Sequence, residues 1–510
     1  MKKIKHISKL LFLLALLLSA CESWLDVNEN PNAPVEVSYE ELLPAGISSV
    51  AYVVGGKYQV LGAMWSQHWT QSPGASQYAG VDAYDINSST YDARQFGELY
   101  SGALKNLEEV RVRSKADGEY KYYFIATVMQ CYTFQVLTDL YGQIPFSEAL
   151  QGDEEIAEPI YEQGRNVYDS LITRLDFALS LDFENKELKD PEEKDLLFNG
   201  DMSKWEEFAN TLKLRIYMRQ TEVSPEKARQ GIQNLYDTDA SFLSNNVALE
   251  VFTNESGRRN PLYDTEVFAF GGNPNLILSN TLYSFLVDNA DFTSLDYLFN
   301  RPSGGGEHKA LIQGDYYAPG EVSGINSSSY SKPVMSADFP VYLMTVSEAL
   351  LLQSEAIIRF NFDDYSEART LYEEAIVEYY DRIMVGVSNT DVQTAAARLI
   401  GGAYSFPSEG TDEEKFIERI ALQKWVCLSG VSNMETFFEL NRTGYPKKSD
   451  VPASNSNYVD GELTVSVNNV TSGKFPKRLI FPESEYANNR NTPALKEVWE
   501  NIWWDISFSN

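Results

Sequence analysis

The segment 70–91, which directly follows Trp69, carries the groups best suited to bind a small polar ligand. Small and turn-forming residues alternate there with tyrosines, including Tyr91, so we expect a loop. Sugar rings present apolar C–H faces that stack on aromatic planes, and their hydroxyl groups need Asp, Asn or Gln partners. Peptides can use the same groups, and the rings can instead pin the loop to the protein body. The residues that we expect to face a ligand are Trp69, Gln71, Tyr78, Asp82, Tyr84 and Asn87.

Residues suited to catalysis are scarce. The sequence contains no GxSxG nucleophile elbow, HExxH, Walker loop or CxxC. Beyond the first twenty residues, His68 and His308 are the remaining histidines, which weakens zinc chemistry and histidine-based general base catalysis as explanations. With 73 acidic residues, some carboxylates must lie close together, so carboxylate pairs carry no weight without geometry. We expect no catalytic activity, cofactor or metal site.

A calcium-loop pattern near the N-terminus is incomplete. Asp26, Asn28 and Asn30 have the spacing of the first ligands of such a loop. Pro31 stands where glycine is required, and Val37 stands where glutamate is required. We interpret the segment as a turn rich in Asp and Asn.

The first residues predict a secretory leader that ends at a cysteine. Four lysines precede the apolar run Leu10–Ala20, which is too short to cross a bilayer. Its end, Leu18-Ser19-Ala20-Cys21, looks like a bacterial lipobox, in which Cys21 becomes the lipidated first residue. Two acyl chains hold a protein on a membrane well, whereas one holds it marginally. The alternative is an ordinary leader followed by a stray cysteine.

The net charge of the chain argues against two classes of binding partner. The net charge of −31 disfavours nucleic acid and anionic headgroups, because both need clustered Lys and Arg.

Cys131 and Cys427 could pair in an oxidising compartment, but we expect two free, buried thiols, since free cysteine packs as a small hydrophobe.

Helical periodicity must supply the scaffold that positions the loop. It begins at Tyr39 and runs towards Trp69, weakened in the middle by Gly55-Gly56. Residues 250–335 lack this helical periodicity, which predicts irregular loops with a few short strands. A loop-rich segment is also expected before residue 480. Other helices are expected at about 93–113, 119–140, 161–180, 205–220, 225–237, 412–428 and 493–505.

The segments 342–360 and 364–384 predict a helical hairpin of the tetratricopeptide type. Ala356, Ala368 and Ala375 are spaced so that two helices can approach closely, and Tyr372 lies four residues after Ala368. The match is partial, because Arg359 occupies the place of the expected aromatic residue in the first helix. A plain helical hairpin is the alternative.

Five segments together resemble the SusD/RagB family of nutrient-binding outer-membrane lipoproteins of Bacteroidota, in its SusD-like branch. Each resembles a motif of that family, and together they extend from Cys21 nearly to the C-terminus. The segments are Cys21–Asn32, Asp139–Ala149 (DLYGQIPFSEA), Gly200–Arg215, Glu435 with Arg442, Gly444, Tyr445 and Pro446, and Arg478–Glu485 with Asn488 and Asn491.

The resemblance implies a fold and a role, but it does not identify the ligand. The fold would be mostly α-helical, with tetratricopeptide-like hairpins and an irregular, loop-rich ligand-facing part. The protein would sit on the outer membrane by its lipid, facing the cell exterior. There it would capture an oligosaccharide or peptide for a SusC-like TonB-dependent barrel, without catalysis. A lipid-anchored hydrolase such as a glycosidase, or a structural or adhesive repeat protein, are the alternatives.

The expected organisation follows from these elements. Residues 1–20 form the leader, 21–38 the lipidated tether, and 39–510 one ligand-binding domain with loop-rich insertions at about 70–91 and 250–335.

Overall fold

The computed structural model describes residues 37–88, 93–152, 156–183, 185, 187–272, 274–316, 327–362 and 364–505. The leader, Cys21, the turn that starts at Asp26 and the loop residue Tyr91 lie outside this part of the chain. Within the described part, no helix combines the length and the apolar character that a bilayer crossing requires.

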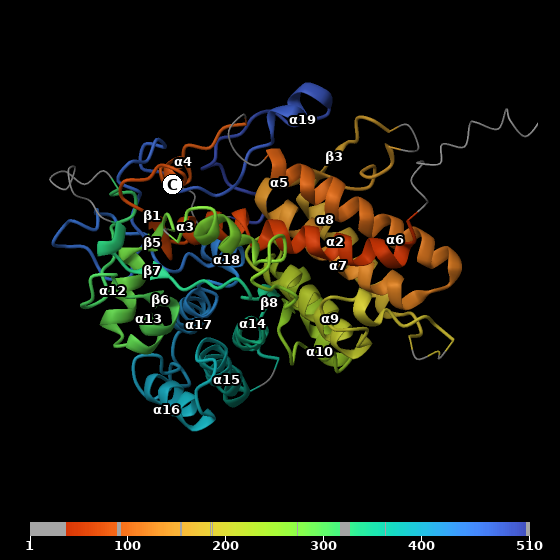
Figure 1. Cartoon of the computed structure of the whole chain (residues 1–510). Helices are drawn as coiled ribbons and strands as arrows, with labels where there is room; N and C mark the ends of the chain where they lie inside the picture. Colours follow the sequence, from red (N-terminus) through yellow and green to blue (C-terminus); the bar gives the residue numbers. More distant parts are fainter. Residues whose placement is uncertain are drawn as a thin grey trace, which may run out of the picture.

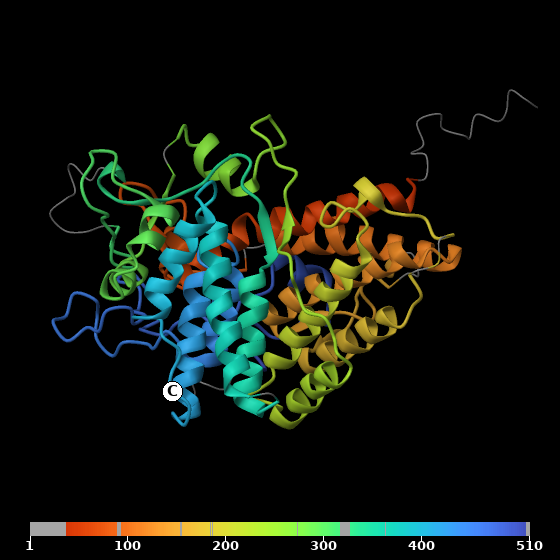
Figure 2. The ribbon, with the colours of Figure 1, turned by 90° about the horizontal axis from the view of Figure 1, so that it is seen from below.

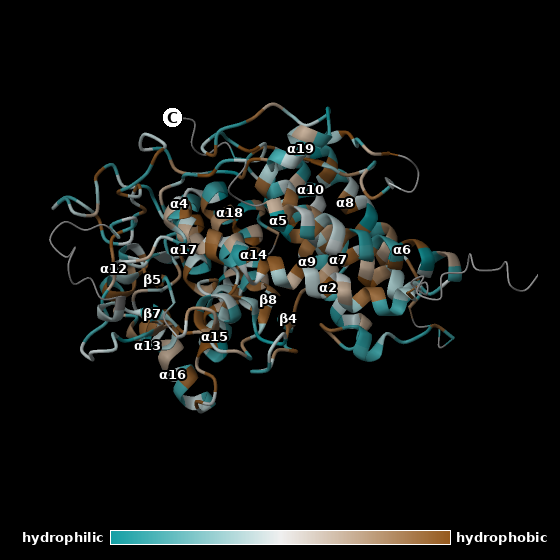
Figure 3. Cartoon of the chain, turned by 45° about the horizontal axis from the view of Figure 1, so that its top comes forward, coloured by the Kyte–Doolittle hydropathy of each residue, from teal (hydrophilic) through white to brown (hydrophobic). Residues whose placement is uncertain are grey.

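The N-terminal half is a bundle of long helices (Figure 1). It consists of α2 (Tyr39–Val54), α6 (Lys105–Asp117), α7 (Tyr120–Tyr141), α8 (Gly164–Leu179) and α9 (Met202–Met218). Helix α7 is buried on nearly all sides, because its neighbours α2, α6, α8 and α9 surround it. Brown and teal residues alternate along the other long helices in Figure 3, as expected for helices that bury one face.

The ends of these helices follow local sequence rules. The Asp201 side chain accepts hydrogen bonds from the backbone N–H groups of Ser203 and Lys204, which fixes the start of α9. Helix α10 (Pro225–Asp237) begins with proline in its first turn, where the missing N–H costs nothing. The prediction of a helix over 225–237 is therefore confirmed.

The expected hairpin is present as α14 (Val346–Phe360) and α15 (Tyr365–Ile383), which lie side by side in Figure 2. Ala356, Ala368 and Ala375 are all fully buried, but Ala356 packs in a cluster with residues of α9 and α10, whereas Ala368 and Ala375 belong to the main core. Two further helices, α16 (Asn389–Ile400) and α17 (Glu413–Cys427), pack against this pair. Cys131 and Cys427 are free and buried, as expected.

Two predictions near the C-terminus are wrong. The segment expected to be loop-rich contains α18 (Asn433–Thr443), and residues 493–505 form no helix. The carbonyl of Val498 accepts hydrogen bonds from the N–H groups of Lys477 and Arg478, so a tertiary contact takes a group that a helix would use internally. The Lys477 Nζ to Asp505 Oδ2 distance of 2.6 Å holds the end of the same segment in place.

The remaining elements are short. Among the described residues, the strands form four antiparallel pairs, of which β1 (Trp69–Gln71) with β5 (Leu276–Leu278) joins the two predicted loop-rich insertions. The other pairs are β2 (Gln143–Pro145) with β3 (Tyr161–Gln163), β4 (Val247–Leu249) with β8 (Val341–Met344), and β6 (Phe299–Asn300) with β7 (Lys332–Pro333). Short helical segments are α3 (Lys57–Trp65), α4 (Ala79–Asp82), α5 (Ala93–Gly97), η2 (Glu98–Leu104), η4 (Glu192–Lys194), α11 (Pro261–Tyr263), η5 (Asp264–Phe268), α12 (Asn280–Asp288), α13 (Phe292–Leu298), η6 (Ser327–Ser329) and α19 (Glu483–Asn488).

A buried network of charged residues connects α7, α9, α14, α17 and α18. Arg219 pairs with Asp139, Glu435 and Glu439, and each of these four side chains is almost completely enclosed. Removing one partner from such a network leaves an uncompensated charge in the interior. The buried members are Asp139, Arg215, Arg219, Glu348, Glu355, Lys424, Glu435, Glu439 and Arg442. Four of them, Asp139, Arg215, Glu435 and Arg442, belong to the segments that carry the family resemblance, so these motif residues hold the fold together.

Candidate functional site

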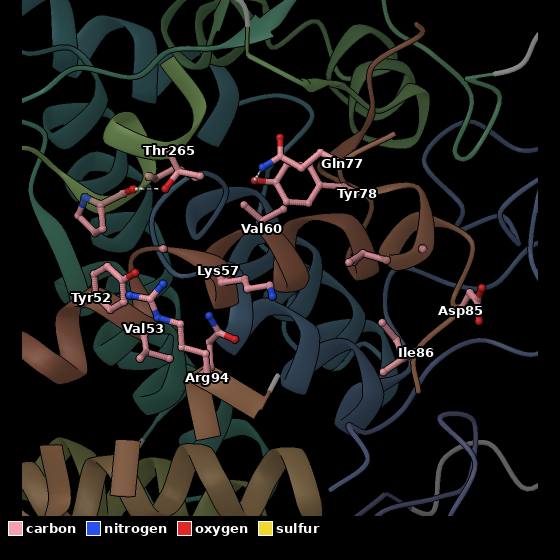
Figure 4. Close-up of a pocket in the computed structure, with 16 residues that line it drawn as sticks. Tyr52, Val53, Lys57, Val60, Gln77, Tyr78, Asp85, Ile86, Arg94 and Thr265 are labelled. Atoms are coloured by element: carbon pink, nitrogen blue, oxygen red, sulfur yellow. Dashed lines mark hydrogen bonds between the residues drawn. The ribbon is translucent and has the colours of Figure 1, made fainter. Parts of the chain in front are cut away.

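A cavity of about 480 Å³ opens between the loop that follows β1 and the break between α2 and α3. Four parts of the chain line it: the α2–α3 junction, the loop 77–86, α5, and the segment that starts at α11. Figure 4 shows side chains from these parts around the cavity. We call it the Tyr52 cavity, after the residue at the end of α2; its other labelled lining residues are Val53, Lys57, Val60, Gln77, Tyr78, Asp85, Ile86, Arg94 and Thr265.

The break at Gly55 and Gly56 determines one wall of the cavity. A Cβ atom on Gly55 would lie 2.4 Å from Cγ2 of Val341 in β8, so only glycine allows this close approach. Helix α2 ends at Val54, and α3 starts after Gly56. The break thereby places Tyr52 before it and Lys57 after it on the same cavity.

Tyr52 is the accessible aromatic side chain of the cavity. It remains 43% exposed, and the Arg94 guanidinium carbon lies 5.8 Å from its ring centroid. Tyr78 also lines the cavity but is only 6% exposed. Its hydroxyl donates to the Glu266 carboxylate and accepts a hydrogen bond of 3.2 Å from Gln77 Nε2. Burial raises the pKa of Glu266, although the Tyr78 hydroxyl opposes the shift.

Five of the six residues expected to face a ligand are buried in this structure, and four of these five lie outside the lining of the cavity. Gln71 and Asp82 are fully enclosed, and Trp69 and Tyr84 are each 2% exposed. These side chains pin the segment to the body, which is the alternative that the sequence left open. Contact between them and a ligand would require the segment to open. Of the other two, Tyr78 lines the cavity, and Asn87 is exposed outside its lining.

Asp82 organises the loop through hydrogen bonds. Its carboxylate accepts from Thr70 Oγ1 at 2.7 Å, from the Gln71 N–H at 2.8 Å and from Gln313 Nε2 at 2.5 Å. Burial raises the pKa of Asp82 to about 6, and these donors only partly offset that effect. Tyr84 is fixed in a similar way, because its hydroxyl accepts from the Ser466 N–H at 3.3 Å.

The sequence analysis missed Tyr52, Lys57 and Arg94. They belong to three separate helices and share no spacing that marks a site. The one usable signal was a tyrosine near the Gly55-Gly56 pair, which separates α2 from α3.

A second cavity, of about 580 Å³, lies near the C-terminus. Its lining includes Lys448, Lys474 and Trp499, and the Lys474 Nζ atom is 5.1 Å from the ring centroid of Trp499. Burial and the nearby Lys477 lower the pKa of Lys448 to about 8. We consider the Tyr52 cavity the candidate site, because it contains residues of the predicted loop.

One Ser–His–Asp arrangement has distances that would suit a hydrolase. His308 Nδ1 lies 2.9 Å from Ser331 Oγ, and His308 Nε2 lies 3.0 Å from Asp296 Oδ1. However, Ser331 is fully buried, and its Oγ already accepts a hydrogen bond from the Lys309 N–H. A substrate carbonyl cannot reach this hydroxyl as the chain is folded, so the arrangement has a structural explanation.

Comparison with known proteins supports an outer-membrane binding role for this architecture. A family model described as "Starch-binding associating with outer membrane" matches residues 31–465. No curated protein sequence matches the chain.

Solved structures resemble the chain over nearly its whole length. A SusD homologue from Bacteroides uniformis is 20% identical, with a TM-score of 0.71, covering 91% of this chain and 99% of its own. A chitin-binding SusD homologue from Flavobacterium johnsoniae is 19% identical, with a TM-score of 0.71 and the same coverage. A structure named a chitin-binding protein is 22% identical, with a TM-score of 0.70, covering 92% of this chain and 100% of its own. At these identities the likeness shows the fold.

Proposed function

The chain belongs to the SusD-like family of starch-binding proteins that associate with the outer membrane, and from this premise we propose that it captures an oligosaccharide in the Tyr52 cavity. The observation that carries the proposal is the cavity itself, which combines an exposed tyrosine with amide, carboxylate and cationic side chains. Its volume of about 480 Å³ falls within the range of small-molecule sites.

The lining groups suit a sugar better than an apolar ligand. Tyr52 offers a flat face for C–H groups, while Gln77 and Asp85 are exposed and have polar ends that can bond hydroxyl groups. Two of the structural neighbours are named as chitin-binding, so chitin fragments join starch fragments among the glycans to be tested. A peptide remains the second ligand class, because it can use the same groups.

We further propose that Cys21 carries the lipid and that the protein faces the cell exterior beside a SusC-like TonB-dependent barrel. The leader and its lipobox support the anchor, and the family supports the outer membrane. In this role the protein binds and releases its cargo without chemical change. Residues 39–510 act as one ligand-binding unit, in which the β1–β5 pair connects the two loop-rich insertions on the ligand-facing side.

Calorimetric titration of the chain that starts after Cys21 tests ligand capture. The titrants are maltoheptaose, chitohexaose and an alanine-rich hexapeptide. Tyr52→Ala should weaken binding of the active ligand by ~1–3 kcal/mol, about 5- to 100-fold, if the sugar stacks on the exposed ring. Tyr297→Ala is the matched control, because Tyr297 is 37% exposed and lies outside the cavity lining. Equal affinities for the two variants would argue against the Tyr52 cavity.

The anchor and the partner need separate measurements on the native protein. Mass spectrometry of its N-terminal peptide should show acyl chains on Cys21. A TonB-dependent barrel should co-purify with it from detergent-solubilised outer membranes. New reducing ends released from the glycans would instead point to a hydrolase.

A further inference from the structure

The charged groups of the Tyr52 cavity are separated in space. Its charged lining residues are Lys57, Asp85 and Arg94. Figure 4 shows Lys57 and Arg94 in the part of the cavity next to Tyr52, whereas Asp85 lies at the opposite end. The Arg94 guanidinium therefore places a positive charge at one end of the cavity, in a protein whose net charge is −31.

The Arg94 guanidinium is available for a ligand. Within the described ranges of the chain it takes part in no ion pair and no hydrogen bond, and its contact is with the ring of Tyr52. By contrast, the interior arginines Arg215, Arg219 and Arg442 are all paired with carboxylates. An arginine supported on an aromatic face keeps its N–H edge open for a second partner.

We propose that the Tyr52 cavity prefers an oligosaccharide that carries an acidic group, a carboxylate or a sulfate, over its neutral counterpart. This inference rests on the proposed function and names the substrate class of the same site. The planar guanidinium of Arg94 can donate two parallel hydrogen bonds to either anion. The sugar ring then extends from Tyr52 towards Gln77.

The overall negative charge of the protein does not oppose this preference at short range. At physiological ionic strength the screening length is about 8 Å, so distant carboxylates contribute little inside the cavity. A charge-assisted contact with Arg94 acts over a hydrogen-bond distance and is much less screened. The preference for an acidic sugar should consequently persist at physiological ionic strength.

A pair of probes that share their sugar rings but differ in charge tests the preference by calorimetry. Trigalacturonic acid and its fully methyl-esterified form have the same sugar rings, but only the first carries carboxylates. We expect the acid to bind at least ten-fold more tightly than the ester. Neocarratetraose sulfate is the sulfate arm, and the tighter of the two acidic probes identifies the anion.

Variants at Arg94 assign the effect to this cavity. Arg94→Gln should abolish the preference for the acid, and Arg94→Lys should keep part of it because the charge remains. Arg258→Gln is the control, since Arg258 is exposed and lies outside the cavity lining. Unchanged melting temperatures of all three variants show that the fold is retained.

Three results would overturn the inference. Equal binding of the acid and the ester, with a loss of both in Tyr52→Ala, would reject the acidic preference and keep the proposed function. An acid preference that survives in Arg94→Gln would place the anion site elsewhere. If neither the acidic nor the neutral glycans bind the wild-type protein, the proposed function fails together with this inference.

Discussion

Replacing Arg442 by methionine should severely destabilise the protein, because this arginine neutralises two buried carboxylates at once. Its Nη1 and Nη2 atoms lie 2.8 and 2.7 Å from the oxygens of Glu355, and its Nε lies 2.9 Å from Glu439 Oε1. All three side chains are enclosed in the interior. Methionine fills a similar volume but leaves both carboxylates with fewer partners.

The magnitude follows from what remains after the change. Burial alone would raise the pKa of Glu355, but Arg442 and Arg359 instead lower it to about 2, so this carboxyl group is charged at neutral pH. Loss of one partner from a buried ion pair costs about 3–5 kcal/mol. Lys424 and Arg359 still contact Glu355, so we expect the lower part of this range. Since domains have total stabilities of only about 5–15 kcal/mol, the shift in the unfolding midpoint should be large.

Urea unfolding followed by tryptophan fluorescence and by circular dichroism measures this cost. Arg229→Met is the control, because Arg229 pairs with Glu226 on the surface, where an ion pair contributes little. A cycle with Glu355→Gln isolates the coupling between the two partners, which should exceed 1 kcal/mol for residues in direct contact. If Arg442→Met unfolds at the same urea concentration as Arg229→Met, the ion pairs of Arg442 with Glu355 and Glu439 do not stabilise the fold.

Two further substitutions test the cavity wall and the loop. Gly55→Ala should destabilise the protein by ~1–3 kcal/mol, because the new Cβ would meet Val341. Gly97→Ala is the control, because the new methyl group would have open space around it and should leave the stability unchanged. Equal melting temperatures of the two variants would show that Gly55 is not required for this packing. The raised pKa of Asp82, about 6, means that this group stabilises the fold most below pH 4 and that its contribution is lost as the pH rises through 6. The difference in unfolding free energy between wild type and Asp82→Asn should therefore change by up to about 3 kcal/mol between pH 4 and pH 7, and a constant difference would show that burial does not shift this group.

Local patterns predicted most of the long helices well. The period of apolar residues located α7, α10, α14, α15 and α17. The segment expected from Tyr39 towards Trp69 is two helices, because the Gly55-Gly56 pair, expected only to weaken its middle, separates α2 from α3. The expected mostly α-helical, SusD-like fold is confirmed by the structure and by its neighbours. These successes share a cause, because periodicity, caps and glycine breaks act within a few residues of one another.

Predictions that depended on distant contacts were less successful. The segment 493–505 is rich in tryptophan, but its Val498 carbonyl bonds the backbone at Lys477 and Arg478. Trp69 and Tyr84 have the chemistry of ligand-binding residues, yet β1 pairs with β5 and Tyr84 packs against Phe475, so both rings are buried. Amino-acid type alone does not reveal whether an aromatic ring faces a ligand or the core.

The sequence by itself determined the helical scaffold and, through its motifs, the family to which the chain belongs. The tertiary structure decided where those motif residues lie, since Asp139, Arg215, Glu435 and Arg442 come from three helices and meet in one buried network. It also decided the composition of the Tyr52 cavity, which brings Tyr52, Lys57 and Arg94 together with the loop. Such sites depend on the crossing and packing of separate elements, and a linear pattern of residues carries no direct record of that geometry.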